Sequence, residues 1–211
     1  MEKVYIIGIG PGSIEYLTYR AHRTICDADV LVGVERLLSL FVSTFDEEKR
    51  TISLKGNYSK VLEYILNNRE REKIAVLVTG DPGLFSFSTL ITERLHPDDY
   101  EIIPGISSLQ LAFARIGEPW QDVCILSLHG RTRAGVFDAV INNERVFLLT
   151  DKTNSPSSIA IYLYKKGVKE RKVIVFENLS LSNERIIHTD IITLKECKEE
   201  MKNLCVMLIQ K

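Results

Sequence analysis

Short apolar runs alternate with amphipathic segments through the first half of the chain. Val4–Ile9 and Ile74–Val78 are rich in β-branched residues, which is typical of strands buried on both faces. Between such runs, apolar residues recur every three or four positions, as in a helix with one buried face. This alternation predicts right-handed crossovers and a mainly parallel sheet. The strands expected here are Val4–Ile9, Val30–Val32, Thr51–Leu54, Ile74–Val78 and Glu101–Ile103.

The helices between these strands follow from the same periodicity. We expect the first to begin after Ser13, whose side chain can cap a helix N-terminus, and to end in the Asp27–Asp29 region. Its buried stripe would consist of Ile14, Leu17, Ala21 and Ile25. Further helices are expected at Leu37–Phe41, Tyr58–Leu66 and Ser86–Leu95, and another begins at Ser107.

The pattern changes at Gly117–Trp120, where glycine and proline interrupt the alternation. We place a domain boundary there, which gives an N-terminal α/β domain of residues 1–116 and a C-terminal α/β domain of residues 117–211. Some connections beyond it are short, which permits antiparallel pairing and predicts a mixed sheet. Its strands are expected at Val123–Leu128, Val146–Leu149, Val173–Phe176, Arg185–Ile192 and Leu204–Ile209, with helices near Ala134–Ile141 and Ser155–Lys165. The mixed charges of Glu196–Lys202 predict an exposed helix with a solvated surface.

Composition narrows the class of protein. The 211 residues are 45% hydrophobic and 26% charged, which is ordinary for a globular protein, and the net charge of -1 argues against a dedicated nucleic-acid binder. No apolar run is long enough to span a bilayer, and the N-terminus lacks a secretory signal, so we expect a cytoplasmic protein. The four cysteines form no CxxC pair and no zinc-like spacing with histidine, so neither a metal site nor a disulfide is expected.

Three glycine-containing loops follow predicted strands: Gly8–Gly12, Gly80–Gly83 and Pro104–Ser108. Carboxyl ends of parallel strands lie at one edge of a sheet, and glycine lets a ligand approach the backbone closely, so together these loops predict a binding site. The first is not a dinucleotide-binding fingerprint, because Ser13 stands where the last glycine of GxGxxG belongs and Pro11 lacks a backbone donor. Taken singly, the first two loops are also compatible with tight turns, and in the third Ser107 or Ser108 could simply cap the following helix.

The order and spacing of these motifs resemble one known family. GIGPG with Leu17-Thr18 downstream, then VTGDPGLFS and PGISS, resemble the tetrapyrrole methylases, the S-adenosylmethionine enzymes of corrin and sirohaem synthesis. The resemblance covers essentially the whole chain. In its second half, Ser127–Arg131, Leu149–Asp151 and Glu177–Leu179 resemble the family members that methylate C5 of a cobalt-precorrin.

The resemblance implies the two-domain tetrapyrrole methylase fold, that of a class III methyltransferase, usually assembled as a homodimer. S-adenosylmethionine would bind in a trough between the domains, beside a corrin precursor. The implied reaction converts cobalt-precorrin-6B to cobalt-precorrin-7 in cobalamin biosynthesis, with C15 methylation and decarboxylation left to a separate partner protein. Positions that match cofactor contacts of the family are Pro11, Gly80, Asp81, Gly83, Leu84, Ser107, Ser108, Thr150 and Leu179.

The chemistry of methyl transfer fits what the sequence offers. Displacement at a sulfonium methyl group needs alignment and exclusion of water more than a covalent nucleophile on the protein. His129 is the candidate for accepting a proton afterwards, and its alternative is a structural histidine at a turn. Arg131 and Lys152 could pair with the acetate and propionate groups of the substrate, whereas for Arg133 we favour an ordinary exposed loop.

Two other functions remain open from the sequence. One is a methylase of the same fold that acts at another ring position or on a protein. The other is a non-catalytic nucleotide-binding module, because an α/β pattern by itself does not fix a function.

Overall fold

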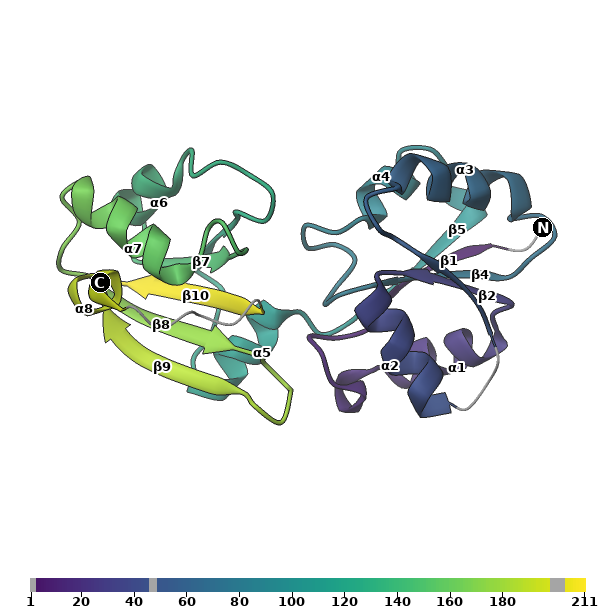
Figure 1. Cartoon of the computed structure of the whole chain (residues 1–211), viewed down its shortest axis with the longest axis horizontal. Helices are drawn as coiled ribbons and strands as arrows, with labels where there is room; N and C mark the ends of the chain where they lie inside the picture. Colours follow the sequence, from purple (N-terminus) through teal and green to yellow (C-terminus); the bar gives the residue numbers. More distant parts are fainter. Residues whose placement is uncertain (1–2, 46–48, 198–203) are drawn as a thin grey trace. The chain divides into compact units, whose positions relative to one another are not determined.

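The chain forms two compact units, each with its own five-stranded sheet (Figure 1). This computed structural model describes residues 3–45, 49–197 and 204–211. The first unit ends at Ser107 and the second begins at Ser108, so the division lies before the boundary that we expected at Gly117. The reason is helix α5 (Ser108–Ile116), whose Phe113 ring lies 6.0 Å from that of Phe147 in the second sheet.

The sheet of the first unit is parallel throughout its described pairs, which confirms the predicted architecture. Its strands lie in the order β3-β2-β4-β1-β5. Their bounds are β1 (Val4–Gly8), β2 (Val30–Gly33), β3 (Arg50–Ser53), β4 (Ile74–Val78) and β5 (Tyr100–Ile103).

Both faces of this sheet are covered by helices, which explains the uninterrupted apolar runs. Helices α1 (Tyr19–Asp27) and α2 (Glu35–Phe45) lie on one face, and α3 (Tyr58–Asn68) and α4 (Ser88–Thr92) on the other (Figure 1). Successive strand residues point to opposite faces, so Ile6 packs with the α3 side and Ile7 with the α1 side.

Strands β1 and β4 are neighbours, but the chain leaves them toward opposite faces of the sheet. After β1 it enters α1, and after β4 it enters α4 on the other face. Adjacent strands with this property form a topological switch point, where open α/β sheets bind their ligands. The loops after β1 and β4 therefore occupy the part of this unit best suited to a site.

The first helix differs from the prediction. Ser13 caps only a short 3-10 helix, η1 (Ile14–Tyr16), and α1 begins later with Thr18 as its cap, whose Oγ1 accepts the N–H of Ala21 at 3.2 Å. Leu17, between them, has an extended backbone, because the Thr18 side chain takes over the N-terminal donors of the helix. Ile14 is consequently 37% exposed instead of part of the buried stripe.

The sheet of the second unit is mixed, as predicted, in the order β6-β7-β10-β8-β9. Its β6–β7 pair is parallel and its other described pairs are antiparallel. The strands are β6 (Cys124–Ser127), β7 (Arg145–Leu149), β8 (Lys172–Glu177), β9 (Arg185–Asp190) and β10 (Cys205–Gln210). One face packs against helices α6 (Val136–Asn142), α7 (Pro156–Lys165) and α8 (Ile191–Glu196).

Other predicted elements also have different bounds in the structure. The expected strand Arg185–Ile192 stops at Asp190, because that carboxylate accepts the N–H of Thr193 at 2.8 Å and caps α8. Helix α4 is shorter than expected. Of the predicted helix Glu196–Lys202, Glu196 ends α8, and residues 198–202 lie outside the described chain.

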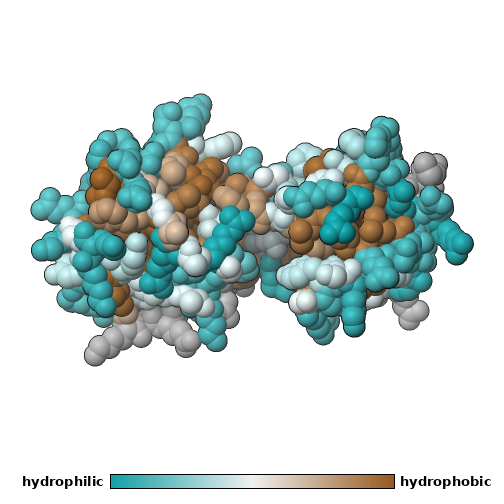
Figure 2. Space-filling view, turned by 90° about the horizontal axis from the view of Figure 1, so that it is seen from above, coloured by the Kyte–Doolittle hydropathy of each residue, from teal (hydrophilic) through white to brown (hydrophobic). Residues whose placement is uncertain are grey.

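The face that carries α3 and α4 shows apolar surface among hydrophilic residues (Figure 2). Tyr58, Phe85 and Leu90 are each 46% exposed.

Within the described ranges, no helix combines the length and apolar character needed to cross a membrane.

Candidate functional site

The loops after β1, β4 and β5 meet at the carboxyl edge of the first sheet through backbone contacts. The N–H of Gly80 donates to the carbonyl of Gly10 at 2.8 Å, which joins the first two loops. A β carbon placed on Gly105 would lie 2.4 Å from the carbonyl oxygen of Gly80 and 2.6 Å from the carbonyl carbon of Gly8. The three loops predicted from the sequence are thus packed together at positions that only glycine can occupy.

The carboxylate of Asp81 ties two of these loops together. Its Oδ1 accepts the N–H of Gly83 at 2.8 Å within the same loop, and its Oδ2 accepts the N–H of Gly105 at 3.1 Å from the loop after β5. Asp81 therefore shapes the site. The sequence alone did not reveal this role, because Gly105 lies 24 residues further along the chain.

The other first-unit residues that we expected at the site lie in or beside these loops. Pro11 and Gly80 are buried, Gly83 is exposed, and Leu84 is half-buried. Ser107 is buried at the end of the third loop. Next to Leu84, Phe85 has a φ of 51°, which is rare for a residue with a side chain and marks a strained backbone.

The second unit gathers its predicted site residues at one edge of its own sheet, beyond the carboxyl ends of β6, β7 and β8. Thr150 follows β7, and its buried hydroxyl donates to the carbonyl of Cys205 at 2.7 Å. Leu179 follows β8, where the N–H of Asn178 donates to the carbonyl of Leu204 at 2.8 Å. Thr150 and the Leu179 segment therefore flank the start of β10.

The loop after β6 carries His129 and Arg131, and both are exposed. Asp151 and Asn154, to which we had given no role, hold it. Asp151 Oδ2 accepts the N–H of Gly130 at 2.7 Å, and its Oδ1 accepts the N–H of Asn154 at 2.6 Å. The side-chain amide of Asn154, which is only 4% exposed, donates to the carbonyls of Leu128 and Arg131 at 2.9 and 3.0 Å. The sequence did contain a signal for this role, because Asp and Asn side chains in short loops often hydrogen-bond to the backbone.

The expectation for Arg133 was wrong, because its side chain is half-buried and fully engaged. Its Nε donates to Asn154 Oδ1 at 2.9 Å, and its Nη2 donates to Ser158 Oγ at 2.9 Å and to the carbonyl of Thr153 at 3.1 Å. The guanidinium also lies over the Tyr162 ring. Arg133 therefore fixes the neighbouring loop. Lys152, in contrast, is exposed, as Arg131 is.

Electrostatics favour a charged Asp151 and a neutral Cys205. Burial raises the pKa of Asp151, but the backbone N–H donors of Asn154 and Gly130 outweigh it and hold this pKa below its ordinary value. Burial, followed by the nearby Glu177 carboxylate, raises the pKa of the Cys205 thiol to about 12. Cys205 is therefore not a thiolate nucleophile at neutral pH.

Asn154→Ala is expected to lower the free energy of unfolding by ~1–3 kcal/mol, because the buried carbonyl of Leu128 loses one of its two hydrogen bonds and the Nε of Arg133 loses its acceptor. Chemical unfolding followed by circular dichroism measures this effect. Asn142→Ala, on an exposed position at the end of α6, is the control. An Asn154→Ala protein as stable as the wild type would contradict the network.

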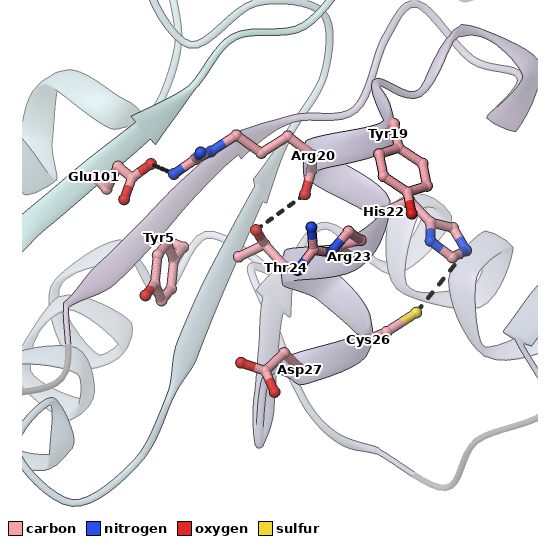
Figure 3. Close-up of a pocket in the computed structure, with 9 residues that line it drawn as sticks. All are labelled: Tyr5, Tyr19, Arg20, His22, Arg23, Thr24, Cys26, Asp27 and Glu101. Carbon is pink, nitrogen blue, oxygen red and sulfur yellow. Dashed lines mark hydrogen bonds and ion pairs between the residues drawn. The ribbon is translucent and has the colours of Figure 1, made fainter.

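The first unit also has a cavity of about 690 Å³, and Figure 3 shows the residues that line it. Its walls come from α1 and from the amino-terminal halves of β1 and β5, and an ion pair between Arg20 and Glu101 joins α1 to β5. It is lined by Tyr5, Tyr19, Arg20, His22, Arg23, Thr24, Cys26, Asp27 and Glu101. None of the residues expected to bind cofactor or substrate belongs to it.

Two known methyltransferases are similar to this chain in sequence. A protein of Methanocaldococcus jannaschii named "Probable cobalt-precorrin-7 C(5)-methyltransferase" is 38% identical over 93% of this chain and 90% of its own. A "Precorrin-6Y C(5,15)-methyltransferase [decarboxylating]" of Sinorhizobium sp is 30% identical over 86% of this chain, which spans 43% of that larger protein.

Solved structures share the fold. The "Cobalamin Biosynthesis Precorrin-6Y Methylase (cbiE)" of Archaeoglobus fulgidus superposes with a TM-score of 0.74 at 23% identity, over 99% of this chain and 97% of its own. A uroporphyrin-III C-methyltransferase of Thermus thermophilus, complexed with S-adenosylhomocysteine, gives 0.77 at 20% identity, over 99% and 97%. A model of the family "Tetrapyrrole (Corrin/Porphyrin) Methylases" matches residues 3–195. The chain belongs to the tetrapyrrole methylase family.

Proposed function

We propose that this protein is an S-adenosylmethionine-dependent methyltransferase that methylates C5 of a cobalt-precorrin, forming cobalt-precorrin-7 in cobalamin biosynthesis. The observation that carries the proposal is the meeting of three glycine-containing loops at the switch point of the first sheet. The relative from M. jannaschii, whose name gives this reaction, supports the choice of substrate and ring position.

The residues at this edge suit S-adenosylmethionine. Gly80 and Gly83 put no side chain between a ligand and the backbone, and the half-buried Ser108 offers a hydroxyl group. We assign cofactor contacts to these three and to Pro11, Asp81, Leu84, Ser107, Thr150 and Leu179. When bound, S-adenosylmethionine supplies an activated methyl group on its sulfonium.

The reaction asks little covalent chemistry of the protein. The ring carbon of the substrate would be the nucleophile and the methyl group of S-adenosylmethionine the electrophile, so the part of the protein is to align them and to exclude water. The proton that the ring then loses needs an acceptor, and we assign this task to His129, whose exposed imidazole lies in the loop that Asp151 and Asn154 hold. Arg131 and Lys152 supply positive charge for the carboxylates of the substrate.

The wider setting is part of the same proposal. We place the enzyme in the cytoplasm as a homodimer. We assign C15 methylation and decarboxylation to a separate partner, and the name of the Sinorhizobium relative, which joins positions 5 and 15 with decarboxylation, supports a link between these activities.

Two experiments test the proposed function. Isothermal calorimetry with S-adenosylhomocysteine should show saturable binding, and its absence would favour a non-catalytic module instead. Mass and NMR analysis of a cobalt-precorrin after turnover should locate one new methyl group at C5. A methyl group elsewhere would leave a methylase of this family with another specificity.

Arg131→Ala is expected to raise the Michaelis constant for the polycarboxylate substrate about tenfold, with a much smaller effect on kcat and on the affinity for S-adenosylhomocysteine. Steady-state kinetics and calorimetry separate these quantities. Arg94→Ala, at an exposed position in the first unit, is the matched control. If only the cofactor affinity changed, Arg131 would have no role in substrate binding.

A further inference from the structure

The loop between β8 and β9 has a strained backbone. Asn178 and Ser180 have φ angles of 50° and 71°, in the left-handed region that residues with side chains seldom adopt. Between them lies Leu179, which is 6% exposed. Strain of this kind persists only where surrounding contacts impose it, and it is concentrated at binding sites.

The side chain of Glu184 supports this loop. Its Oε2 accepts the N–H of Ser180 at 2.6 Å. Its two carboxylate oxygens also accept from the guanidinium of Arg115, with Nε at 2.6 Å and Nη2 at 3.2 Å. Such a two-point contact fixes orientation as well as distance. Arg115 holds the pKa of Glu184 below its ordinary value, so the carboxylate is charged at neutral pH.

Arg115 is itself held in place by the second unit. It lies in the last turn of α5, where the helix dipole favours a cation. The same helix packs through Phe113 onto Phe147 in β7. A continuous series of contacts thus runs from the sheet through α5 and Arg115 to Glu184, and from Glu184 to the backbone of Ser180.

We propose that Glu184 and Arg115 are positioning residues for the cofactor, because they hold Asn178–Ser180 in the conformation that binds S-adenosylmethionine. They act through the loop and not by contact with the cofactor. This inference rests on the proposed function, in which Leu179 is a cofactor contact. Thr150, at the same edge of the sheet, is held by the Cys205 carbonyl and does not depend on the Arg115–Glu184 pair.

Calorimetry with S-adenosylhomocysteine tests the inference at a temperature where every variant is folded. Glu184→Ala and Arg115→Ala should each weaken binding about tenfold, or ~1.4 kcal/mol. Glu184→Gln should lose only about threefold, because its amide oxygen still accepts the Ser180 N–H. Glu118→Gln is the matched control: it alters another Glu–Arg pair of the second unit, with Arg145 at 3.6 Å, and should bind within about twofold of the wild type.

A second variant separates positioning from general stability. Ser180→Gly in the Glu184→Ala protein should recover part of the lost affinity, because glycine adopts positive φ without strain. No recovery, or a Glu184→Ala protein that binds within about twofold of the wild type, would overturn the inference. A wild-type protein that does not bind S-adenosylhomocysteine would instead overturn the proposed function, and this inference with it.

Discussion

Gly105→Ala is expected to abolish S-adenosylhomocysteine binding and to lower the free energy of unfolding by ~3 kcal/mol or more, at the upper end of the cost of overpacking. The new β carbon would lie 2.4 Å from the carbonyl oxygen of Gly80 and 2.6 Å from the carbonyl carbon and oxygen of Gly8. These are backbone atoms at the end of β1 and in the loop after β4, so no side-chain rotation can relieve the overlap. The loops must separate, and the edge that we assign to the cofactor then changes shape.

Calorimetry and urea unfolding monitored by circular dichroism measure both effects. For the stability measurement alone, the matched control is Gly83→Ala in the same cluster, because a β carbon there meets only the Asp81 carboxylate, at 3.0 Å. Its loss of stability should stay below ~1 kcal/mol. Wild-type stability and wild-type affinity in Gly105→Ala would show that the three loops are not packed as described.

Asp81→Ala should weaken S-adenosylhomocysteine binding at least about tenfold and lower the free energy of unfolding by ~1–3 kcal/mol. The sequence led us to expect a cofactor contact at this position. The structure adds a cost to the fold, because the N–H groups of Gly83 and Gly105 both lose their acceptor. The same calorimetric and unfolding measurements apply.

Asp81→Asn sharpens this test. One amide oxygen can replace one carboxylate oxygen, but the amide NH2 group would face the other N–H donor, so part of both losses should remain. Asp98→Ala, whose side chain is 90% exposed, is the control and should be neutral. Unchanged affinity in both Asp81 variants would remove Asp81 from the site.

The three loops that form the candidate site could be predicted from the sequence, but the contacts between them could not. A glycine cluster directly after an apolar run is a local signal, and it identified the loops after β1, β4 and β5. The partner of Asp81 in the third loop, and the partners of Asn154 at Leu128 and Arg131, are distant in sequence. Only the order of strands in each sheet brings these groups within hydrogen-bond distance.

Two of the errors in the predicted elements have the same physical cause. Thr18 and Asp190 each end an extended segment by capping a helix, and in both places the apolar pattern continued across the cap. Apolar spacing reports which residues are buried but not where the chain changes from strand or turn to helix. The prediction that Arg133 lies in an ordinary exposed loop was wrong for a different reason. A charged residue in a loop sequence gives no sign that the fold will surround it with hydrogen-bond acceptors.

By itself the sequence determined the α/β class, the parallel and mixed sheets, the three glycine loops and the resemblance to the tetrapyrrole methylases, because these follow from residue types and short spacings. The tertiary structure decided where the two units divide, that Asp81 joins two loops, that Asn154 and Arg133 fix the loop of His129, and that Arg115 supports the strained Leu179 segment through Glu184. Arg115 and Glu184 are 69 residues apart in the chain. Their contact depends on the packing of α5 against the second sheet, which no local pattern records.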